Sequence, residues 1–445
     1  MRLGIDFGTT NSGVGLFDGE QVRVLPVERR NKDASVVRTL LYLTRDDQVY
    51  IGQAAIDTYY KQNIGRARRL TKKVVGEIEV VAAEMFFVRQ VHVMVDELTP
   101  GRLFQSLKSG LKEAGFSGTD VFGRTFSLEE LIALYLSELR ERASEIVGQQ
   151  ITSVVLGRPV NFGADASFNE LAARRLRTAA ELAGFEDIVF ELEPIAAALS
   201  YQRTIERPQR ILVFDFGGGT LDLTVMQVGG DEREVLATGG INIAGDTFDQ
   251  EILRYRVLDY FGRGTTIGER DLPFPAHLTE SLTHWQEIPA LSKPETLQML
   301  DEAQRTGSHP SRVQALESLV VNNYGFALFD AVEQAKCELS EDFHAVVRLQ
   351  AQDIDVWQLL TRAQFETLIV GHRRKIAECV QDTVRRSGLR PDEIDAVVRT
   401  GGSSQIPCFV ALLADQFGAE KLRLENTFSG VTAGLAIRAW ELDRG

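Results

Sequence analysis

The fold is decided by one stretch, Ile211-Leu-Val-Phe-Asp-Phe-Gly-Gly-Gly-Thr-Leu-Asp-Leu-Thr-Val225. A short apolar run ends at Asp215, three glycines and a threonine turn the chain, and a second apolar run follows with Asp222 near its start. This pattern predicts a buried β-hairpin. Because glycine has no Cβ, the turn can approach a ligand closely, and its N–H groups can hold phosphate oxygens. Asp215, at the end of the strand, is a suitable ligand for Mg²⁺, directly or through water.

A second stretch, Leu3-Gly-Ile-Asp-Phe-Gly-Thr-Thr-Asn-Ser-Gly-Val-Gly-Leu-Phe17, has the same pattern. Asp6 corresponds to Asp215, and Gly8 corresponds to Gly217. One such hairpin alone is an ordinary turn about as often as it is a phosphate loop. Two in one chain indicate a duplicated lobe, with two loops that close on one magnesium–nucleotide complex.

A third glycine motif, Gly401-Gly-Ser-Ser404, lies between a predicted strand at Ile394–Thr400 and a predicted helix at Cys408–Phe417. The ends of strands are where α/β folds present their ligands. Glycines at that position let a base or a ribose pack directly on the backbone.

The rest of the chain alternates strands with helices, which predicts an α/β fold with layers of sheet and helix. We expect one lobe at 1–205, completed by a C-terminal helix at 426–445, and a second lobe at 206–425. Within the second lobe, about 262–311 is rich in proline, glycine and charge and is interpreted as an insertion. Each lobe is expected to hold a mixed sheet flanked by helices.

Three helices follow from hydrophobic periodicity. Leu128–Val147 is the clearest, and Ser127 with Glu130 forms a capping box at its start. The same criterion predicts a helix at Leu103–Ala114 and one long helix at Val313–Leu339.

Composition excludes several classes of protein. Among the 445 residues, 49 Lys and Arg face 63 Asp and Glu, for a net charge of −14. Such a chain has no general affinity for nucleic acid or an anionic membrane, so neither is an expected partner. The three cysteines have no disulfide or zinc spacing, and no apolar run is long enough to span a bilayer. We expect a soluble, cytoplasmic protein.

The three glycine motifs resemble the phosphate-one, phosphate-two and adenosine motifs of the actin/sugar-kinase/heat-shock ATPase superfamily, a two-lobed, actin-like fold with a duplicated ribonuclease H-like core. Further motifs narrow the resemblance to the DnaK-type heat-shock chaperones: Glu193–Tyr201, Gly245–Asp249, Glu333–Ser340 and Leu360–Phe365. The sequence ends after the last helix of that family's nucleotide-binding domain, so it resembles the YegD-like, stand-alone subgroup. This resemblance implies a chain that lacks a peptide-binding domain.

The resemblance also implies a site for ATP or ADP with Mg²⁺. Asp6, Glu193 and Asp215 would hold the hydrated magnesium, Lys72 would orient the attacking water, and Asp222 would help to position that water. The phosphates would contact Thr9, Thr10, Gly217, Gly218, Gly219 and Thr220, and the ribose and adenine would contact Glu333, Lys336, Ser340 and Gly402. The nucleotide site would be completed by Gly8, Asn11, Gly245, Gly401 and Ser403.

One departure concerns the base. The family holds adenine between two arginines, and the matching positions here are Cys337 and Gln405. The loss of two cation–π contacts predicts weaker nucleotide binding and poorer discrimination between adenine and guanine.

The resemblance implies slow hydrolysis of ATP to ADP and phosphate, a chaperone-like role, and co-chaperone or client proteins as partners besides the nucleotide. Three alternatives stay open. A small-molecule kinase of the same superfamily would phosphorylate an added acceptor. A nucleotide-dependent scaffold would bind ATP without significant turnover, and an actin-like protein would form filaments.

Overall fold

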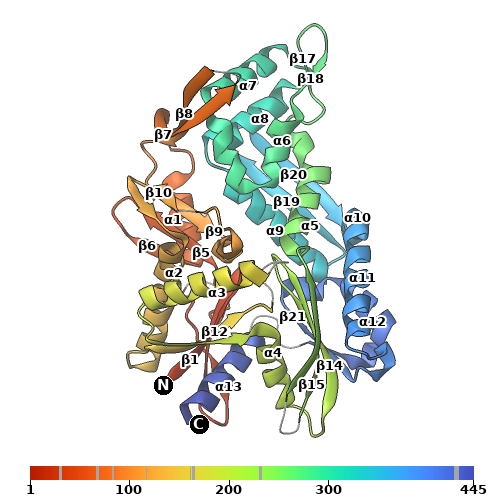
Figure 1. Cartoon of the computed structure of the whole chain (residues 1–445). Helices are drawn as coiled ribbons and strands as arrows, with labels where there is room; N and C mark the ends of the chain where they lie inside the picture. Colours follow the sequence, from red (N-terminus) through yellow and green to blue (C-terminus); the bar gives the residue numbers. More distant parts are fainter. Residues whose placement is uncertain are drawn as a thin grey trace. The chain divides into compact units, whose positions relative to one another are not determined.

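The structure is a computed structural model that describes the chain except for residues 30–32, 67–69, 83–84, 117, 161, 163–165, 230–232, 425–429 and 445. At residues 70, 72–82, 85–95, 166, 285–286 and 289 the description is limited to the backbone. The chain divides into two compact units. Figure 1 labels its helices and strands. The first comprises Met1–Tyr59, Arg102–Thr247 and Ile369–Gly445, and the second comprises Tyr60–Gly101 and Phe248–Leu368.

The first unit contains two mixed sheets. One has the strand order β13-β12-β1-β2-β3, with β4 paired to β2. Strand β1 is parallel to β12, which is parallel to β13, whereas β1, β2 and β3 are antiparallel in turn. The strands are β1 (Arg2–Phe7), β2 (Asn11–Phe17), β3 (Val22–Val24), β4 (Val37–Arg38), β12 (Ser153–Arg158) and β13 (Asp187–Leu192).

The other sheet repeats this topology in the order β22-β21-β14-β15-β16. Its first three strands are parallel and its last three are antiparallel in turn. The strands are β14 (Gln209–Phe216), β15 (Leu221–Val228), β16 (Glu234–Ile241), β21 (Ala396–Thr400) and β22 (Leu422–Leu424). The shared topology is the one expected of a duplicated core, and both predicted glycine hairpins are present as β1–β2 and β14–β15.

Two helices of the first unit, α4 (Glu193–Gln202) and α13 (Gly430–Arg444), pack against each other and against strands of the two sheets. Their close crossing requires glycine, because a Cβ on Gly434 would overlap the carbonyl of Ala196. Apolar residues of both helices and both sheets form one cluster, with Val155, Ala197, Val213 and Leu435 among its buried members.

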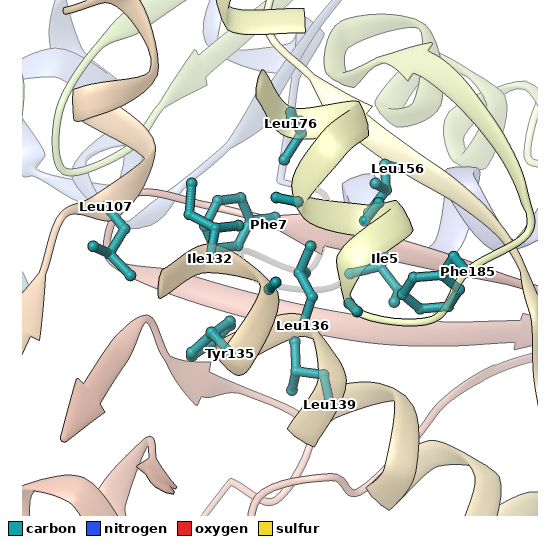
Figure 2. Packing of buried hydrophobic residues seen from close by; sticks show 14 of the residues in the cluster. Ile5, Phe7, Leu107, Ile132, Tyr135, Leu136, Leu139, Leu156, Leu176 and Phe185 are labelled. Carbon is teal, nitrogen blue, oxygen red and sulfur yellow. The ribbon is translucent and has the colours of Figure 1, made fainter. Parts of the chain in front are cut away.

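The larger core lies on the other face of the first sheet, where α2 (Leu128–Val147) and α3 (Ala166–Leu182) cover it (Figure 2). The predicted start of α2 is confirmed, since the Ser127 side chain accepts a hydrogen bond from the Glu130 N–H and the Glu130 side chain accepts one from the Ser127 N–H. Phe7 and Tyr135 meet in this core with ring centroids 5.7 Å apart.

The predicted helix at Leu103–Ala114 is wrong in its first half. Strand β9 (Gly101–Gln105) occupies that part and closes a small sheet with β5 (Leu40–Thr44) and β6 (Val49–Ile51). A 3₁₀ helix, Leu107–Lys112, follows it. The apolar residues are shared between a strand and a short helix, and their combined spacing imitates one longer helix.

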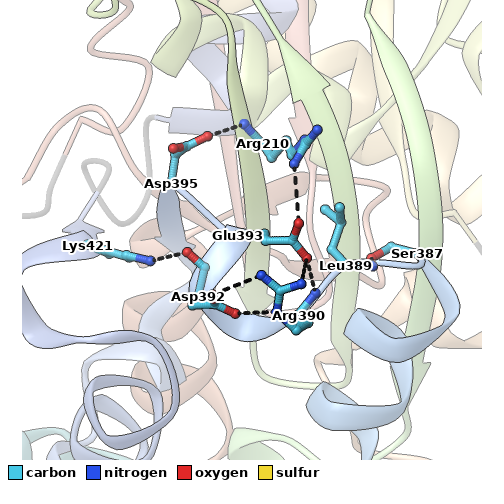
Figure 3. Close-up of polar contacts among 8 residues, drawn as sticks. All are labelled: Arg210, Ser387, Leu389, Arg390, Asp392, Glu393, Asp395 and Lys421. Atoms are coloured by element: carbon cyan, nitrogen blue, oxygen red, sulfur yellow. Dashed lines mark hydrogen bonds and ion pairs between the residues drawn. The ribbon is translucent and has the colours of Figure 1, made fainter.

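The first unit also contains the hairpin β10 (Thr119–Val121) and β11 (Arg124–Phe126), and the helices α11 (Val370–Arg386) and α12 (Pro407–Phe417). Helix α1 (Gln53–Asn63) begins in this unit, and α5 (Gly245–Ile252) starts here as well. Figure 3 shows the contacts where β14 and β21 begin: the Arg210 N–H donates to Asp395 at 2.8 Å, and Lys421 donates to the Asp392 carbonyl at 2.9 Å. These exposed hydrogen bonds join the segments next to the first residues of the two strands.

The second unit holds the hairpin β7 (Leu70–Ala82) and β8 (Met85–Asp96), the hairpin β19 (His344–Ala351) and β20 (Ile354–Thr361), and a helical region. The predicted insertion at 262–311 is mainly helical, with α6 (Ala276–Glu280) and α7 (Pro294–Thr306) after the short hairpin β17 (Thr266–Ile267) and β18 (Leu272–Pro273). Helix α10 (Arg362–Leu368) ends the unit.

The single long helix expected at Val313–Leu339 is wrong. Helices α8 (Pro310–Val321) and α9 (Gly325–Glu341) occupy this stretch and are separated at Asn322–Tyr324. Asn323 has a φ of 63°, a left-handed conformation that asparagine tolerates better than most residues. A residue in this conformation cannot continue an α-helix, so the stretch is divided into two helices at this point.

In the described part of the chain, the helices are all too short or too polar to cross a membrane. The predicted lobe limit at 205/206 falls between the two sheets in the sequence, and the limit at 425/426 lies outside the described residues. These limits therefore stay predictions.

Candidate functional site

The turns that follow Asp6 and Asp215 lie against each other in the first unit. A Cβ on Gly218 would overlap the Thr10 hydroxyl, and a Cβ on Gly219 would lie 3.4 Å from Thr9. Close contact between the two turns therefore depends on glycine in the second one. Gly8 is equally constrained, because a Cβ there would overlap the carbonyl of Asn11, the first residue of β2.

Neighbouring elements hold the second turn in place through its carbonyls. The Gly217 carbonyl accepts hydrogen bonds from the Gly245 N–H at 3.2 Å and from the Ser403 hydroxyl at 2.6 Å. The Gly218 carbonyl accepts one from the Asp246 N–H at 2.8 Å. Because these carbonyls are turned toward protein donors, the N–H groups of Gly218 and Gly219 stay available for an anion.

The third glycine motif packs directly on the second turn. Gly401 has a φ of 79°, and a Cβ there would overlap the Phe216 carbonyl, so both its conformation and its surroundings require glycine. The buried Arg399 guanidinium donates to the Ser404 carbonyl at 2.8 Å and braces the motif from beneath, whereas Gly402 is exposed.

One buried lysine beside these turns contacts one carboxylate and interacts electrostatically with three more. The Lys108 ammonium lies 2.6 Å from Oε1 of Glu193, the first residue of α4, and both side chains are buried. Asp6 and Asp215 are the next-to-last residues of the first strand of each hairpin and interact electrostatically with the same lysine. Asp222, paired with Asp215 across β14 and β15, is buried and accepts a hydrogen bond from the Thr220 hydroxyl at 2.8 Å.

The buried carboxylates of this cluster outnumber its one buried lysine, so the cluster carries an excess of negative charge. Burial and the charge of Glu193 raise the pKa of Asp6 to about 7, against the pull of Lys108. Burial, Glu193, Asp222 and Asp6 together hold the pKa of Asp215 well above its usual range. Burial raises the pKa of Asp222 to about 6, although the Thr220 hydroxyl opposes this shift. The carboxylates repel one another, so a bound cation would stabilise the ionised cluster.

For Lys108, burial alone would lower the pKa, but attraction to Glu193, Asp6 and Asp215 outweighs burial and leaves it raised. The lysine is therefore charged at neutral pH. Its contact with Glu193 makes it a buried, fixed positive charge at the site.

The donor set fits hydrated magnesium. Its oxygens are the hard ligands that Mg²⁺ takes, and Mg²⁺ commonly keeps several waters while it is held by one or two carboxylates. Among the residues that the structure describes, no group of three His, Cys, Asp or Glu side chains is close enough to ligate one ion directly. Asp6, Glu193 and Asp215 would accordingly hold the ion through its water molecules.

Lys108 was not among the residues singled out from the sequence. It is the second residue of the 3₁₀ helix Leu107–Lys112, which lies inside the stretch Leu103–Ala114 that the sequence analysis interprets as one helix. Lys72, the lysine that the resemblance indicates, lies in β7 of the second unit and its side chain is not described. The available signal for Lys108 was a lysine directly after Leu107, within a stretch whose apolar positions are Leu103, Leu107 and Leu111.

The predicted ribose and adenine contacts from α9 belong to the second unit. Glu333, Lys336 and Ser340 follow the helical spacing that places them on one face. Lys336 is buried, with its ammonium 2.6 Å from Oδ2 of Asp249. Burial lowers the pKa of Lys336, but the charges of Asp249 and Glu333 outweigh burial and leave that pKa raised. Cys337, the next residue along, is exposed.

Comparison with known proteins identifies the family. The model of the family described as "Hsp70 protein" matches residues 2–272 and 323–443. Chaperone protein dnaK of Cyanidioschyzon merolae is 26% identical over 454 residues, covering 98% of this chain and 61% of the relative. Chaperone protein DnaK from two strains of Thermus thermophilus is 26% identical over 446 residues, covering 98% of this chain and 60% of the relative. The chain thus spans about three fifths of the length of these curated relatives.

Proposed function

Because the chain belongs to the Hsp70 family, whose fold is the two-lobed, actin-like ATPase fold, we propose that it binds ATP and hydrolyses it to ADP and phosphate at the glycine turns of the first unit. One observation carries the proposal. A charged lysine, Lys108, is buried among Glu193, Asp6 and Asp215 beside two phosphate-loop-like turns in contact with each other. An ion pair that served only to stabilise the fold would not need glycine turns beside it.

The two turns would hold the β- and γ-phosphates. The N–H groups of Gly218 and Gly219 and the hydroxyls of Thr9 and Thr10 provide donors without a bulky side chain to exclude the phosphate. Gly401, Gly402 and Ser403 would support the nucleoside, with further contacts from Glu333, Lys336 and Ser340. These roles rest on the family and on the chemistry of the residues.

Magnesium held by Asp6, Glu193 and Asp215 would supply positive charge to the phosphate oxygens. With that charge in place, the carboxylates are ionised at neutral pH and act as acceptors that orient the water molecules around the ion. This is phosphoryl transfer to water, in which positioning and charge stabilisation supply most of the catalysis.

Lys108 is proposed to direct its charge at the transferring phosphoryl group or at the attacking water. The Glu193 contact fixes the ammonium in position, so no reorganisation is needed during the reaction. The resemblance gives this role to Lys72, and that prediction stands beside the one for Lys108 until variants separate them. Asp222, with a pKa of about 6 and the Thr220 hydroxyl as donor, is proposed to position the water.

A chaperone-like role in the cytoplasm, and membership of the YegD-like subgroup, are proposals that rest on the relatives' names and on the resemblance. The relatives are chaperone proteins, so co-chaperones and client polypeptides are the proposed partners. Phosphate release measured with and without added co-chaperones tests this part, and a rate that no such protein changes argues against it.

The test of the proposed function is phosphate release from ATP by the purified chain, with Mg²⁺ and with a chelator. We expect slow, magnesium-dependent release without any added acceptor. If ATP binds but no phosphate appears over many hours, the nucleotide-dependent scaffold is the better account. If ATP is consumed only after a sugar or an organic acid is added, the chain is a small-molecule kinase.

A further inference from the structure

Ser106 adopts a conformation that serine rarely takes, at the junction that leads to Lys108. Its φ is 55° and its ψ is 32°, in the left-handed region, and its side chain makes no capping hydrogen bond to the 3₁₀ helix that follows. For a residue with a Cβ, this conformation costs about 1–2 kcal/mol. Such strained residues persist where the surrounding structure requires them, and they cluster at functional sites.

The surroundings of Ser106 fix the chain on both sides. Before it, β9 places Leu103 and Phe104 in buried positions. After it, Leu107 and Leu111 of the 3₁₀ helix Leu107–Lys112 are buried in the core of the first unit, where Figure 2 shows Leu107 in the same cluster as Phe7 and Ile132. The strand and the 3₁₀ helix are each anchored by apolar side chains.

The direction of Lys108 follows from this junction. With Leu107 and Leu111 held in the core, the rotation of the 3₁₀ helix is set by the backbone angles where it begins. The Ser106 carbonyl accepts a hydrogen bond from the Ser109 N–H at 3.0 Å, which closes the first turn around Lys108. In this rotation the lysine reaches Glu193. A continued strand would put Leu107 and Lys108 on opposite faces.

We propose that the left-handed backbone of Ser106 is a positioning element for Lys108: it turns the chain from β9 into the 3₁₀ helix so that the lysine reaches Glu193 while Leu107 stays in the core. This inference rests on the proposed function for its effect on catalysis, but not for its effect on the position of Lys108. The backbone, rather than the serine hydroxyl, is the functional part.

Two substitutions separate backbone from side chain. Ser106→Gly removes the hydroxyl but accepts positive φ without strain, so it should keep both turnover and burial of Lys108. Ser106→Val is β-branched and disfavours positive φ, so it should turn Lys108 away from Glu193. We expect Ser106→Val to lower kcat for ATP at least tenfold with KM changed less than threefold, and Ser106→Gly to stay within twofold of the wild type.

The matched control is Asp47→Val. Asp47 is an exposed residue at φ 60° in the β5–β6 turn of the same unit, so valine there introduces the same backbone strain away from the lysine. This variant should lower the melting temperature about as much as Ser106→Val but leave kcat unchanged. In a Lys108→Ala background, Ser106→Val should change kcat less than twofold, because the group that it displaces is already absent.

A second readout does not depend on turnover. Acetylation of lysines by a small amine-reactive acetylating agent, followed by peptide mass spectrometry, reports whether Lys108 is buried. The exposed Lys61 and Lys375 serve as internal standards. Lys108 should be protected in the wild type, Ser106→Gly and Asp47→Val, and labelled at least fivefold faster in Ser106→Val. Any of three results would overturn the inference. They are that Lys108 stays protected in Ser106→Val, that Lys108 loses its protection in Ser106→Gly, or that Ser106→Val lowers kcat equally with and without Lys108. If the wild type does not hydrolyse ATP but the four proteins show the expected labelling of Lys108, only the proposed function is contradicted.

Discussion

The ammonium of Lys108 lies 2.6 Å from a carboxylate oxygen of Glu193, and both side chains are buried. Removing one partner of such a pair leaves the other charge buried and uncompensated, which is commonly more costly than the pair is worth. The pair therefore places a fixed cation and an acceptor at one point of the first unit. Asp6 and Asp215 add further negative charge around it.

The carboxylates at the ends of β1 and β14 should be needed for magnesium-dependent turnover. Asp6→Asn and Asp215→Asn each keep the shape of the side chain and remove its charge, so each should lower ATP hydrolysis at least tenfold, or about 1.4 kcal/mol of barrier. The Mg²⁺ concentration that gives half-maximal rate should rise in both variants. Asp395→Asn, directly before β21 of the sheet that contains Asp215 and among the exposed contacts of Figure 3, is the control and should keep its rate.

If neither Asp6→Asn nor Asp215→Asn changes the rate or the magnesium dependence, the ion is held elsewhere. An effect of the Asp395 control as large as theirs would point to general damage of the fold.

The pKa of Asp6 predicts how stability depends on pH without nucleotide or magnesium. Its pKa is about 7 in the folded state against an ordinary 3.8, so between about pH 4 and pH 7 the folded state binds more protons than the unfolded state. Stability from this group is therefore present in acid and is lost as pH rises through 7. Asp215 shifts in the same direction and adds to the effect.

Asp6→Asn should remove part of this loss and stabilise the apoprotein at pH 8 by on the order of 2 kcal/mol, with little effect at pH 4.5. Urea unfolding in a chelating buffer at the two pH values measures it. Wild-type stability that rises steadily from pH 4.5 to 8, with no gain for the variant, would contradict the electrostatics described for this cluster.

Base recognition should be weak. Cys337 and Gln405 are exposed and carry no charge, and Arg399 donates to the Ser404 carbonyl from a buried position. A stacked arginine contributes roughly 0.5–2 kcal/mol. Cys337→Arg with Gln405→Arg should therefore tighten ATP more than GTP in calorimetric titrations, while Cys337→Lys with Gln405→Lys, which adds charge without a planar group, should gain less. A wild type that already binds ATP tightly and rejects GTP would show that other residues recognise the base.

The glycine hairpins and the helix at 128–147 were predictable because their signals are local. Ser127 and Glu130 are three residues apart and cap each other, and the turn after Asp215 is marked by the consecutive glycines Gly217–Gly219. Each signal lies within one short segment. The residue types themselves determine the backbone there.

Lys108 could not be predicted because its position depends on a conformation that its neighbours in sequence do not indicate. Serine is not a residue that marks a left-handed turn, so nothing in the local sequence indicates the break at Ser106, which lies between β9 and the buried Leu107 and Leu111. The hairpin β19–β20 was missed for another reason. Its alternation of buried Ile354 and Val356 with exposed Trp357 was present in the sequence but was not recognised as a strand period.

The central claim is that Lys108, held by Glu193, acts on phosphoryl transfer. Its most direct test is the single-turnover rate of hydrolysis of bound ATP in the wild type, Lys108→Ala and Lys72→Ala, with nucleotide affinity measured on the same samples. We expect Lys108→Ala to slow hydrolysis at least tenfold while ATP affinity changes less than threefold, whatever the effect of Lys72→Ala. A normal rate in Lys108→Ala, together with a loss in Lys72→Ala, would contradict the claim and assign the catalytic lysine to β7.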